Sequence, residues 1–117
     1  MTPALAKPWQ IPLVNNVRVT GGGAQPRVSW TLPDLARRNI DRVRVAVRGG
    51  QRLHGRFLSV LFVSADLPAT ATDFKIPPGI LALSERYIFQ VMLENLEGGE
   101  LKNRSLTFSE PYTVLHQ

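Results

Sequence analysis

The chain has no cysteine and only two histidines among its 117 residues. Without cysteine it forms no disulfide and offers no thiolate for catalysis or for a zinc site. A hydrolytic triad needs a base held by an orienting acid, and His54 has no carboxylate within five residues on either side. We expect His54 to be a solvated loop residue and His116 to belong to a frayed terminus. The sequence therefore predicts a non-enzymatic protein with no catalytic residues.

Long apolar runs are also absent, so the sequence contains no candidate membrane-spanning helix. The start lacks the basic stretch and apolar core of a signal peptide, and we expect that an exported form has already lost its signal. Four aspartates fall in separate turns, where aspartate ordinarily serves backbone geometry. These residues are Asp34, Asp41, Asp66 and Asp73. No cofactor or metal is expected, although a weak calcium site between loops stays open.

The length suits one domain with one hydrophobic core. Apolar residues make up 44% of the chain and charged residues 20%, which is typical of a globular protein. Pro3, Pro8 and Pro12 prevent a regular opening element, so residues 1–11 are predicted to be an extended linker or edge segment. Trp9 in that segment is expected to cover the core, with a ligand platform as the alternative. Residues 12–117 form the predicted domain.

Alternating apolar and polar residues, separated by glycine and proline turns, indicate strands along the whole chain. Gly21–Gly23 has neither a following Lys-Ser/Thr nor a helix, so it is predicted to be a hairpin turn and not a phosphate loop. Strands are expected around residues 14–20, 27–32, 40–47, 57–63, 74–76, 87–95 and 106–112. No segment has sustained helical periodicity. The pattern predicts an all-β, seven-stranded antiparallel sandwich.

A tyrosine at the head of one strand is the most informative single residue. Tyr87 follows Leu81 by six residues, and Phe89 and Val91 share its side of the strand. This arrangement is typical of a tyrosine corner, in which the ring packs inward and the hydroxyl bonds the backbone a few residues upstream. We expect Tyr87 to hold the turn between two sheets.

The chain from about Pro12 to Val114 resembles a fibronectin type III domain. Val28-Ser-Trp30-Thr-Leu-Pro33 is similar to the second strand of that family, with its core tryptophan and terminal proline. Leu81 and Tyr87 match the family's leucine-to-tyrosine corner. Val43 stands where the family usually has an aromatic, and the chain has extra residues between Gly50 and Phe74. The resemblance implies a Greek-key sandwich, and other immunoglobulin-like or cadherin-like sandwiches remain open.

The resemblance and the alternation together give a predicted core. Its members are Trp30, Val43, Val45, Leu81, Tyr87, Phe89 and Val91. The pattern also looks like bacterial exported proteins that carry a single sandwich of this kind. Secretion, the periplasm or the cell surface is therefore the expected location.

The segment Phe57–Val63 is apolar on both faces of any strand and needs a second cover. The predicted protein interface comprises Leu58, Val60, Phe62, Ile88 and Met92. One interpretation is association with another protein or with a second copy of the chain. The other is that the inserted residues 50–73 fold back over the apolar strand.

The net charge of +5 is dominated by arginine, and several arginines share one side of a predicted strand. The predicted polyanion-binding face comprises Arg42, Arg44, Arg48, Arg52 and Arg56. Its expected partners are acidic polysaccharide, an anionic surface or nucleic acid. The alternative is that these arginines pair across strands with Glu94 and its neighbours. Adhesion, spacing or protein interaction is the preferred function, and polyanion binding is the alternative.

Overall fold

The computed structural model describes residues 13–32, 40–49 and 60–116, and the backbone alone of 52–53 and 56–57. The predicted linker 1–11 and Trp9 lie outside the described residues. Within the described part the fold is all-β, without a helix, and antiparallel throughout. None of the described segments is a helix long and apolar enough to cross a membrane.

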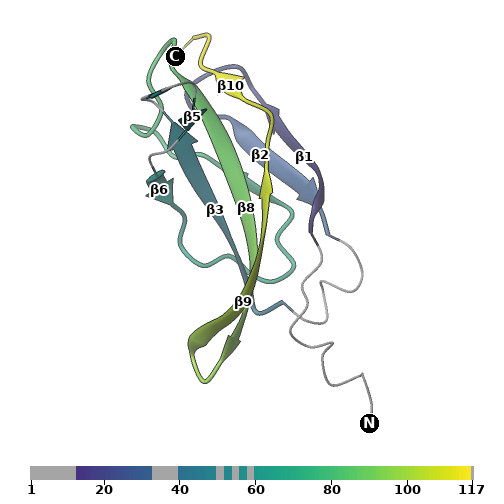
Figure 1. The fold of residues 1–117 in the computed structure, drawn as a ribbon. Helices are drawn as coiled ribbons and strands as arrows, with labels where there is room; N and C mark the ends of the chain where they lie inside the picture. Colours follow the sequence, from purple (N-terminus) through teal and green to yellow (C-terminus); the bar gives the residue numbers. More distant parts are fainter. Residues whose placement is uncertain (1–12, 33–39, 50–51, 54–55, 58–59, 117) are drawn as a thin grey trace.

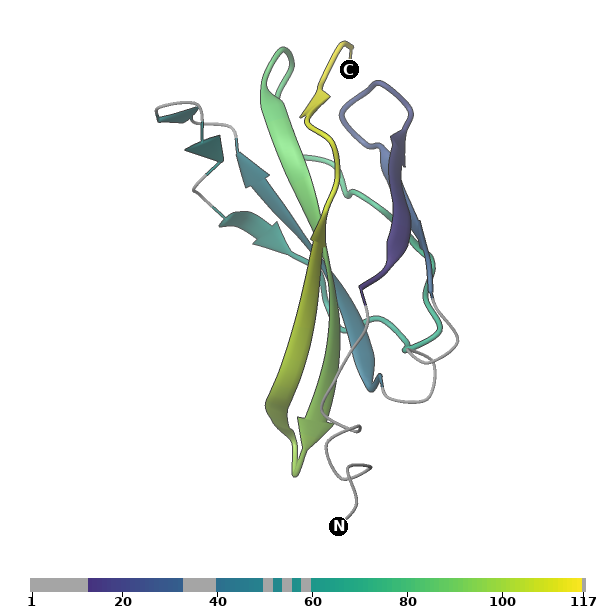
Figure 2. The same cartoon turned by 45° about the vertical axis from the view of Figure 1, so that its right-hand side comes forward.

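Two sheets stack face to face, as Figure 1 and Figure 2 show. The three-stranded sheet has the order β1-β2-β7, with β2 in the middle. Its strands are β1 (Asn15–Thr20), β2 (Arg27–Thr31) and β7 (Asp73–Lys75). The turn at Gly21–Gly23 joins β1 to β2 as an antiparallel hairpin, in agreement with the sequence prediction.

The five-stranded sheet is built around β8, which pairs with β3 on one side and with β9 and β10 on the other. Its strands are β3 (Arg42–Gly49), β6 (Val60–Val63), β8 (Arg86–Glu97), β9 (Glu100–Phe108) and β10 (Tyr112–Thr113). A two-stranded hairpin, β4 (Arg52–Leu53) with β5 (Arg56–Phe57), precedes β6. The tip of the β8–β9 hairpin projects beyond the rest of the sheet (Figure 2).

The described residues therefore contain ten strand segments, where the sequence predicted seven strands. One difference arises at Pro111, which lacks a backbone N–H and separates β9 from β10 along the same edge of β8. The other arises in the insertion after Gly50, where the expected continuous strand 57–63 is divided between β5 and β6. The coarse prediction of an all-β sandwich is confirmed.

The core lies between the two sheets and contains all seven predicted core residues, each at most 7% exposed. Val43, Val45 and Val47 alternate along β3 and point inward with no exposed surface. Trp30 enters from β2, and its indole N–H donates to the carbonyl of Ala71 at 2.9 Å. A buried indole thus has a hydrogen-bond partner, as its polar group requires.

The Tyr87 ring is 2% exposed, and its hydroxyl accepts a hydrogen bond from the Ala82 backbone N–H at 2.7 Å. This is the contact that the tyrosine-corner pattern predicts. Ser84 in the intervening turn has a φ of 68°, a left-handed conformation uncommon for residues other than glycine. The hydroxyl therefore holds a turn whose backbone is itself strained.

The expectation of a frayed end at His116 is wrong. The Leu115 backbone N–H donates to the Gly22 carbonyl at 2.9 Å, and the Tyr112 hydroxyl donates to the Gly23 carbonyl at 2.5 Å. A Cβ added at Gly23 would come within 3.1 Å of the His116 ring. The chain end is held against the β1–β2 turn because glycine there leaves room for the close approach.

Candidate functional site

The candidate site is the outer face of the five-stranded sheet, the side that turns away from β1, β2 and β7. On β3 this face presents Arg42, Arg44, Ala46 and Arg48, which lie opposite Glu94, Met92, Gln90 and Ile88 of β8. Such faces are usually solvated and polar in an antiparallel sandwich. Here Ala46, Gln90, Met92 and Glu94 are all buried. Their neighbours on the same face cover them.

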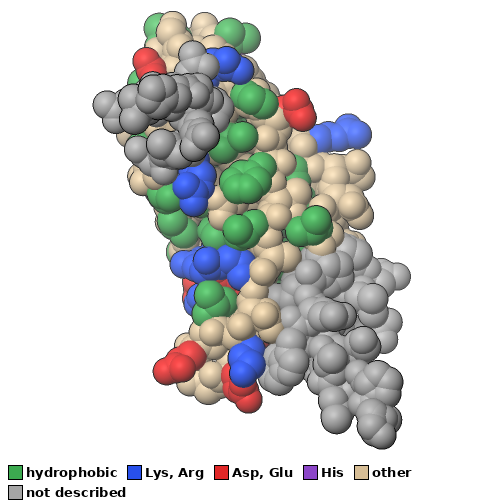
Figure 3. Space-filling view, viewed as in Figure 1, with side chains coloured by type: hydrophobic (Ala, Val, Ile, Leu, Met, Phe, Trp, Pro, Cys, Tyr) green, Lys and Arg blue, Asp and Glu red, His purple; other side chains and the backbone are tan. Residues whose placement is uncertain are grey.

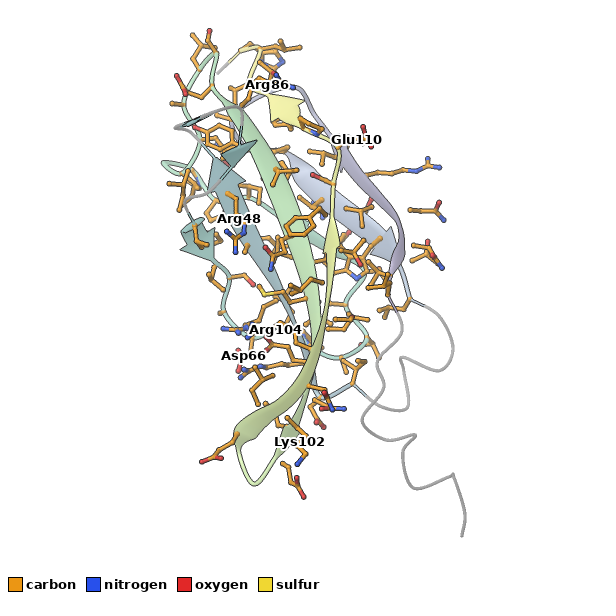
Figure 4. All side chains as sticks on the ribbon, viewed as in Figure 1. Arg48, Asp66, Arg86, Lys102, Arg104 and Glu110 are labelled. Carbon is orange, nitrogen blue, oxygen red and sulfur yellow. The ribbon has the colours of Figure 1, made fainter. Side chains whose placement is uncertain are left out.

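Glu94 has no exposed side-chain surface, and three arginines surround its carboxylate. One of them, Arg104, is labelled in Figure 4, close to Asp66. Its Oε1 accepts from Arg42 Nε at 2.5 Å and from Arg44 Nε at 3.1 Å. Its Oε2 accepts from Arg44 Nη2 at 2.9 Å and from Arg104 Nε at 2.6 Å. Arg42 also reaches Asp66 at 3.4 Å. The cluster joins β3, β8 and β9 across the outer face.

Burial by itself would raise the pKa of Glu94. Hydrogen bonds from Arg44, Arg42 and Arg104 outweigh that effect and hold the pKa at about 2. The hydrogen bond to Glu94 likewise raises the pKa of Arg42 against the opposing effect of burial. The Glu94 carboxylate is therefore ionised at neutral pH, and its negative charge offsets the positive charges of the surrounding guanidinium groups.

The predicted polyanion face is corrected by this cluster. Arg42 and Arg44 are only 21% and 23% exposed and donate to Glu94, so they do not form an open basic row. Arg48 Nε donates to the Gln90 side chain at 2.8 Å. The side chains of Arg52 and Arg56 lie outside the described residues. Cross-strand pairing with Glu94, the alternative raised by the sequence, is what the structure has.

Beside the carboxylate of Glu94 the outer face is slightly hollowed and carries both apolar and arginine side chains. Met92 and Ala46 form the floor of a shallow pocket of about 210 Å³. The pocket is lined by Arg44, Ala46, Arg48, Val60, Val63, Gln90, Met92 and Arg104. Val60 and Val63 of β6 are 48% and 42% exposed, and Figure 3 shows apolar side chains gathered over this part of the sheet. The described part of the insertion does not cover them.

On the opposite side of β8, β9 adds two more exposed apolar residues to the same face. Leu106 lies opposite Met92 and is 41% exposed, and Phe108 lies opposite Gln90 and is 49% exposed. We define the apolar face as Val60, Val63, Leu106 and Phe108 around the floor of Met92 and Ala46. It is continuous in register from β6 through β3 and β8 to β9.

The predicted interface is brought together only in part. Val60 is exposed on the apolar face, Ile88 is half-buried on it, and Met92 is buried in its floor. Phe62 instead pairs with the inward residue Val47 and stacks on Phe74 at 6.3 Å between ring centroids. Phe62 belongs to the edge of the core because it shares the inward side of Val47, and the register shift between Val47 and Arg48 lets Val60 face outward although it is only two residues away. Leu58 lies outside the described residues.

The sequence predicted that Leu106 and Phe108 lie in the last strand, but it did not predict that they join the interface. The signal was present, because Ser105 and Thr107 alternate with them and are the residues that pair with inward Leu93 and Val91. An apolar outer side on an edge strand with a polar inner side is unusual and points to a covered surface.

A second hollow, about 370 Å³, lies at the open side of the sandwich between β1 and the β9–β10 junction. It is lined by Val17, Arg18, Val19, Thr20, Glu110, Pro111 and Tyr112. Among the described residues, no group of three or more histidine, cysteine, aspartate or glutamate side chains is placed to hold a metal ion. The outer face remains the surface with the clearest chemical character.

Comparison with known proteins supports the fold and leaves the function open. No family model and no curated protein matches this chain. A solved structure of a computationally redesigned β-sandwich protein is similar, with a TM-score of 0.60 and 17% sequence identity. The match covers 92% of this chain and 96% of that one. At this identity the likeness establishes a β-sandwich and nothing about activity or partners.

Proposed function

We propose that this chain is a non-catalytic protein-interaction domain that binds a protein partner through the apolar face. The observation that carries the proposal is that exposed Val60 and Val63 of β6 and exposed Leu106 and Phe108 of β9 lie on one face of the sheet, on either side of buried Ala46 and Met92. Isolated exposed apolar residues are ordinary, whereas a patch continuous across four strands marks an interaction site.

The energetics favour a protein partner. Four half-exposed apolar side chains amount to roughly 300 Å², and at about 25 cal/mol per Å² their burial contributes about 7 kcal/mol before the costs of association. Arg44 and Arg48 lie on β3, between the exposed apolar residues of β6 and those of β9, and with Arg104 they line the pocket and supply polar contacts. Arginine is enriched together with large apolar residues in protein interfaces.

A fibronectin type III-like classification is part of the same proposal. The strand orders β1-β2-β7 and β10-β8-β3-β6 and the Tyr87–Ala82 hydrogen bond support it. Domains of that family frequently serve as adhesion modules and spacers, and we extend this role, in an exported bacterial protein, to the present chain.

Selection of peptides from a random display library on the immobilised domain tests the proposal. We expect selected peptides to bind Val63→Glu and Phe108→Glu at least tenfold more weakly than the unaltered chain, because each substitution puts a charged carboxylate where apolar groups of the peptide would pack. Leu83→Glu is the matched control, since Leu83 is 48% exposed but lies in the loop before β8. Equal binding by all variants, or selection of no peptide at all, would rule out the apolar face as a protein-binding site.

Polyanion binding, the alternative function, has less support because Arg42 and Arg44 already donate to Glu94. We expect Arg48→Gln and Arg18→Gln to shift elution from immobilised heparin equally, since each removes one positive charge from a different sheet. Salt-gradient chromatography of the two variants makes this comparison. A much larger shift for Arg48→Gln would favour a specific polyanion site on the outer face.

A further inference from the structure

The edge of β9 that faces away from β8 is long, and no described strand pairs with it. Among the strands that the structure describes, β9 pairs with β8 alone, so half of its backbone groups face outward. It is nine residues long, and its stretch Asn103–Phe108 pairs with β8 without a register shift. A long, regular, unpaired edge is a template for another strand.

The other described edges are interrupted or short. β1 has a register shift between Asn15 and Arg18, and Asn16 has a φ of 56°. β6 has four residues and a register shift, and β7 has three residues. Short strands and bulges are the usual protection against edge pairing. The regular stretch of β9 has neither proline nor bulge, and its charged residue, Arg104, is engaged by Glu94.

The direction of the free backbone groups follows from the pairing with β8. The Ser109 N–H donates to the Phe89 carbonyl, so odd-numbered residues on this part of the chain direct their backbone groups toward β8. Arg104, Leu106 and Phe108 consequently direct theirs toward the open edge. A second strand must align its own outward residues with these three.

Side-chain chemistry then favours one antiparallel register between two copies over the registers centred on Arg104 or Leu106. With Thr107 on the two-fold axis, Leu106 lies opposite Phe108 of the second copy and Arg104 lies opposite its Glu110. Glu110 is exposed, and the Arg104 guanidinium has N–H groups beyond the one given to Glu94. If Arg104 lay on the two-fold axis, the Arg104 side chains of the two copies would lie opposite each other and repel. If Leu106 lay on the axis, Arg104 would lie opposite Phe108 of the second copy.

Thr107 provides an independent reason for this register. Its Oγ1 is buried and has no hydrogen-bond partner among the described residues. In the proposed register the two Thr107 side chains form a directly opposed, non-hydrogen-bonded pair, in which cross-strand threonines come close enough to bond each other. The second copy would supply the missing partner.

We propose that two copies of this chain associate antiparallel through β9, with Thr107 on the two-fold axis. The pairing joins the two five-stranded sheets into one and brings both apolar faces onto the same side. The proposal goes beyond the proposed function, because the edge of β9 can pair whether or not the apolar face binds a different protein.

Single cysteines test the register, since the natural chain has none. Under copper phenanthroline oxidation, Thr107→Cys should form a disulfide dimer at least tenfold faster than Leu101→Cys. The two Thr107 Cα atoms would lie about 5 Å apart, within disulfide range, whereas two Leu101 Cα atoms would lie about 40 Å apart. Leu101 is the control because it is exposed on the same strand.

A second pair of variants tests the same register in case Thr107→Cys folds poorly or its thiol is inaccessible. A mixture of Leu106→Cys and Phe108→Cys should give mainly the mixed disulfide. Equal rates for Thr107→Cys and Leu101→Cys, faster self-linking of Leu106→Cys than of Thr107→Cys, or no preference for the mixed disulfide would each overturn the proposal. So would a monomer by light scattering at every concentration.

Val63→Glu separates this proposal from the proposed function. Val63 lies on β6, two strands beyond β8, and so about 14 Å from the β9 backbone. Introduced alongside Thr107→Cys, it should weaken peptide binding at least tenfold and leave the cross-linking rate unchanged. If Val63→Glu lost cross-linking as well as peptide binding, the edge pairing would be contradicted. If the chain without Val63→Glu cross-linked but bound no peptide, only the apolar-face function would be contradicted.

Discussion

Glu94→Gln should lower the free energy of unfolding by about 3 kcal/mol at pH 7. The substitution keeps the shape of the side chain and removes the negative charge that three arginines share. Breaking a buried ion pair by removing one partner typically costs about 3–5 kcal/mol, and the partial exposure of the arginines places the expected value at the lower end. Urea unfolding followed by tryptophan fluorescence measures the loss, since Trp30 lies in the core.

The charge of Glu94 should also affect how the free energy of unfolding depends on pH. The folded pKa of Glu94 is about 2, below the value near 4.5 expected when the chain is unfolded. Its ionisation therefore stabilises the fold fully above about pH 4.5, and that contribution is lost as the pH falls toward 2. Glu94→Gln should lose less stability than the unaltered chain over this interval, so the two unfolding free energies converge.

Glu97→Gln is the matched control for the removed charge. Glu97 is on the same strand but is exposed, and it pairs with Lys102 at 3.2 Å. Exposed pairs contribute about 0–1 kcal/mol, so this variant should be nearly neutral. If the two glutamine variants had equal stability, the arginine cluster would not stabilise the outer face.

The fold was largely predictable because its determinants are local. Alternation along β3 identified Val43 and Val45 as inward residues, and a period of two allows no other assignment once one side is buried. The separation of Leu81 and Tyr87 predicted a specific hydrogen bond that the structure contains. These patterns depend on residues close in sequence, so they can be recognised before the strand order is known.

The candidate site was less predictable because it depends on pairing between distant strands. Phe62 looked like a surface residue, but the register shift on β6 turns it toward Phe74. Leu106 joined the site only because β9 aligns it with Met92. Similarly, Glu94 accepts a hydrogen bond from Arg104 of β9, a residue that alternation on β3 and β8 gives no reason to consider. Register between strands is set by the whole sheet and not by either segment alone.

Tyr87→Ala should destabilise the domain by about 3–5 kcal/mol, the usual cost of deleting a large buried ring. Tyr87 is 2% exposed and packs in the cluster that contains Trp30 and Phe89. Tyr87→Phe keeps the ring and removes only the acceptor of the Ala82 N–H, so its cost should be about 1 kcal/mol. Thermal and urea unfolding of both variants give the two values.

The difference between these variants separates the contribution of the buried ring from that of the hydroxyl. Tyr112→Phe is the comparison for the hydroxyl, because that side chain is half-buried and its O–H donates to Gly23 across the two sheets. A loss of less than about 1 kcal/mol for Tyr87→Ala would contradict the packing of the ring. A loss for Tyr87→Phe well above that for Tyr112→Phe would instead mean that the strained turn at Ser84 depends on the hydroxyl, since no other part of the tyrosine corner is altered.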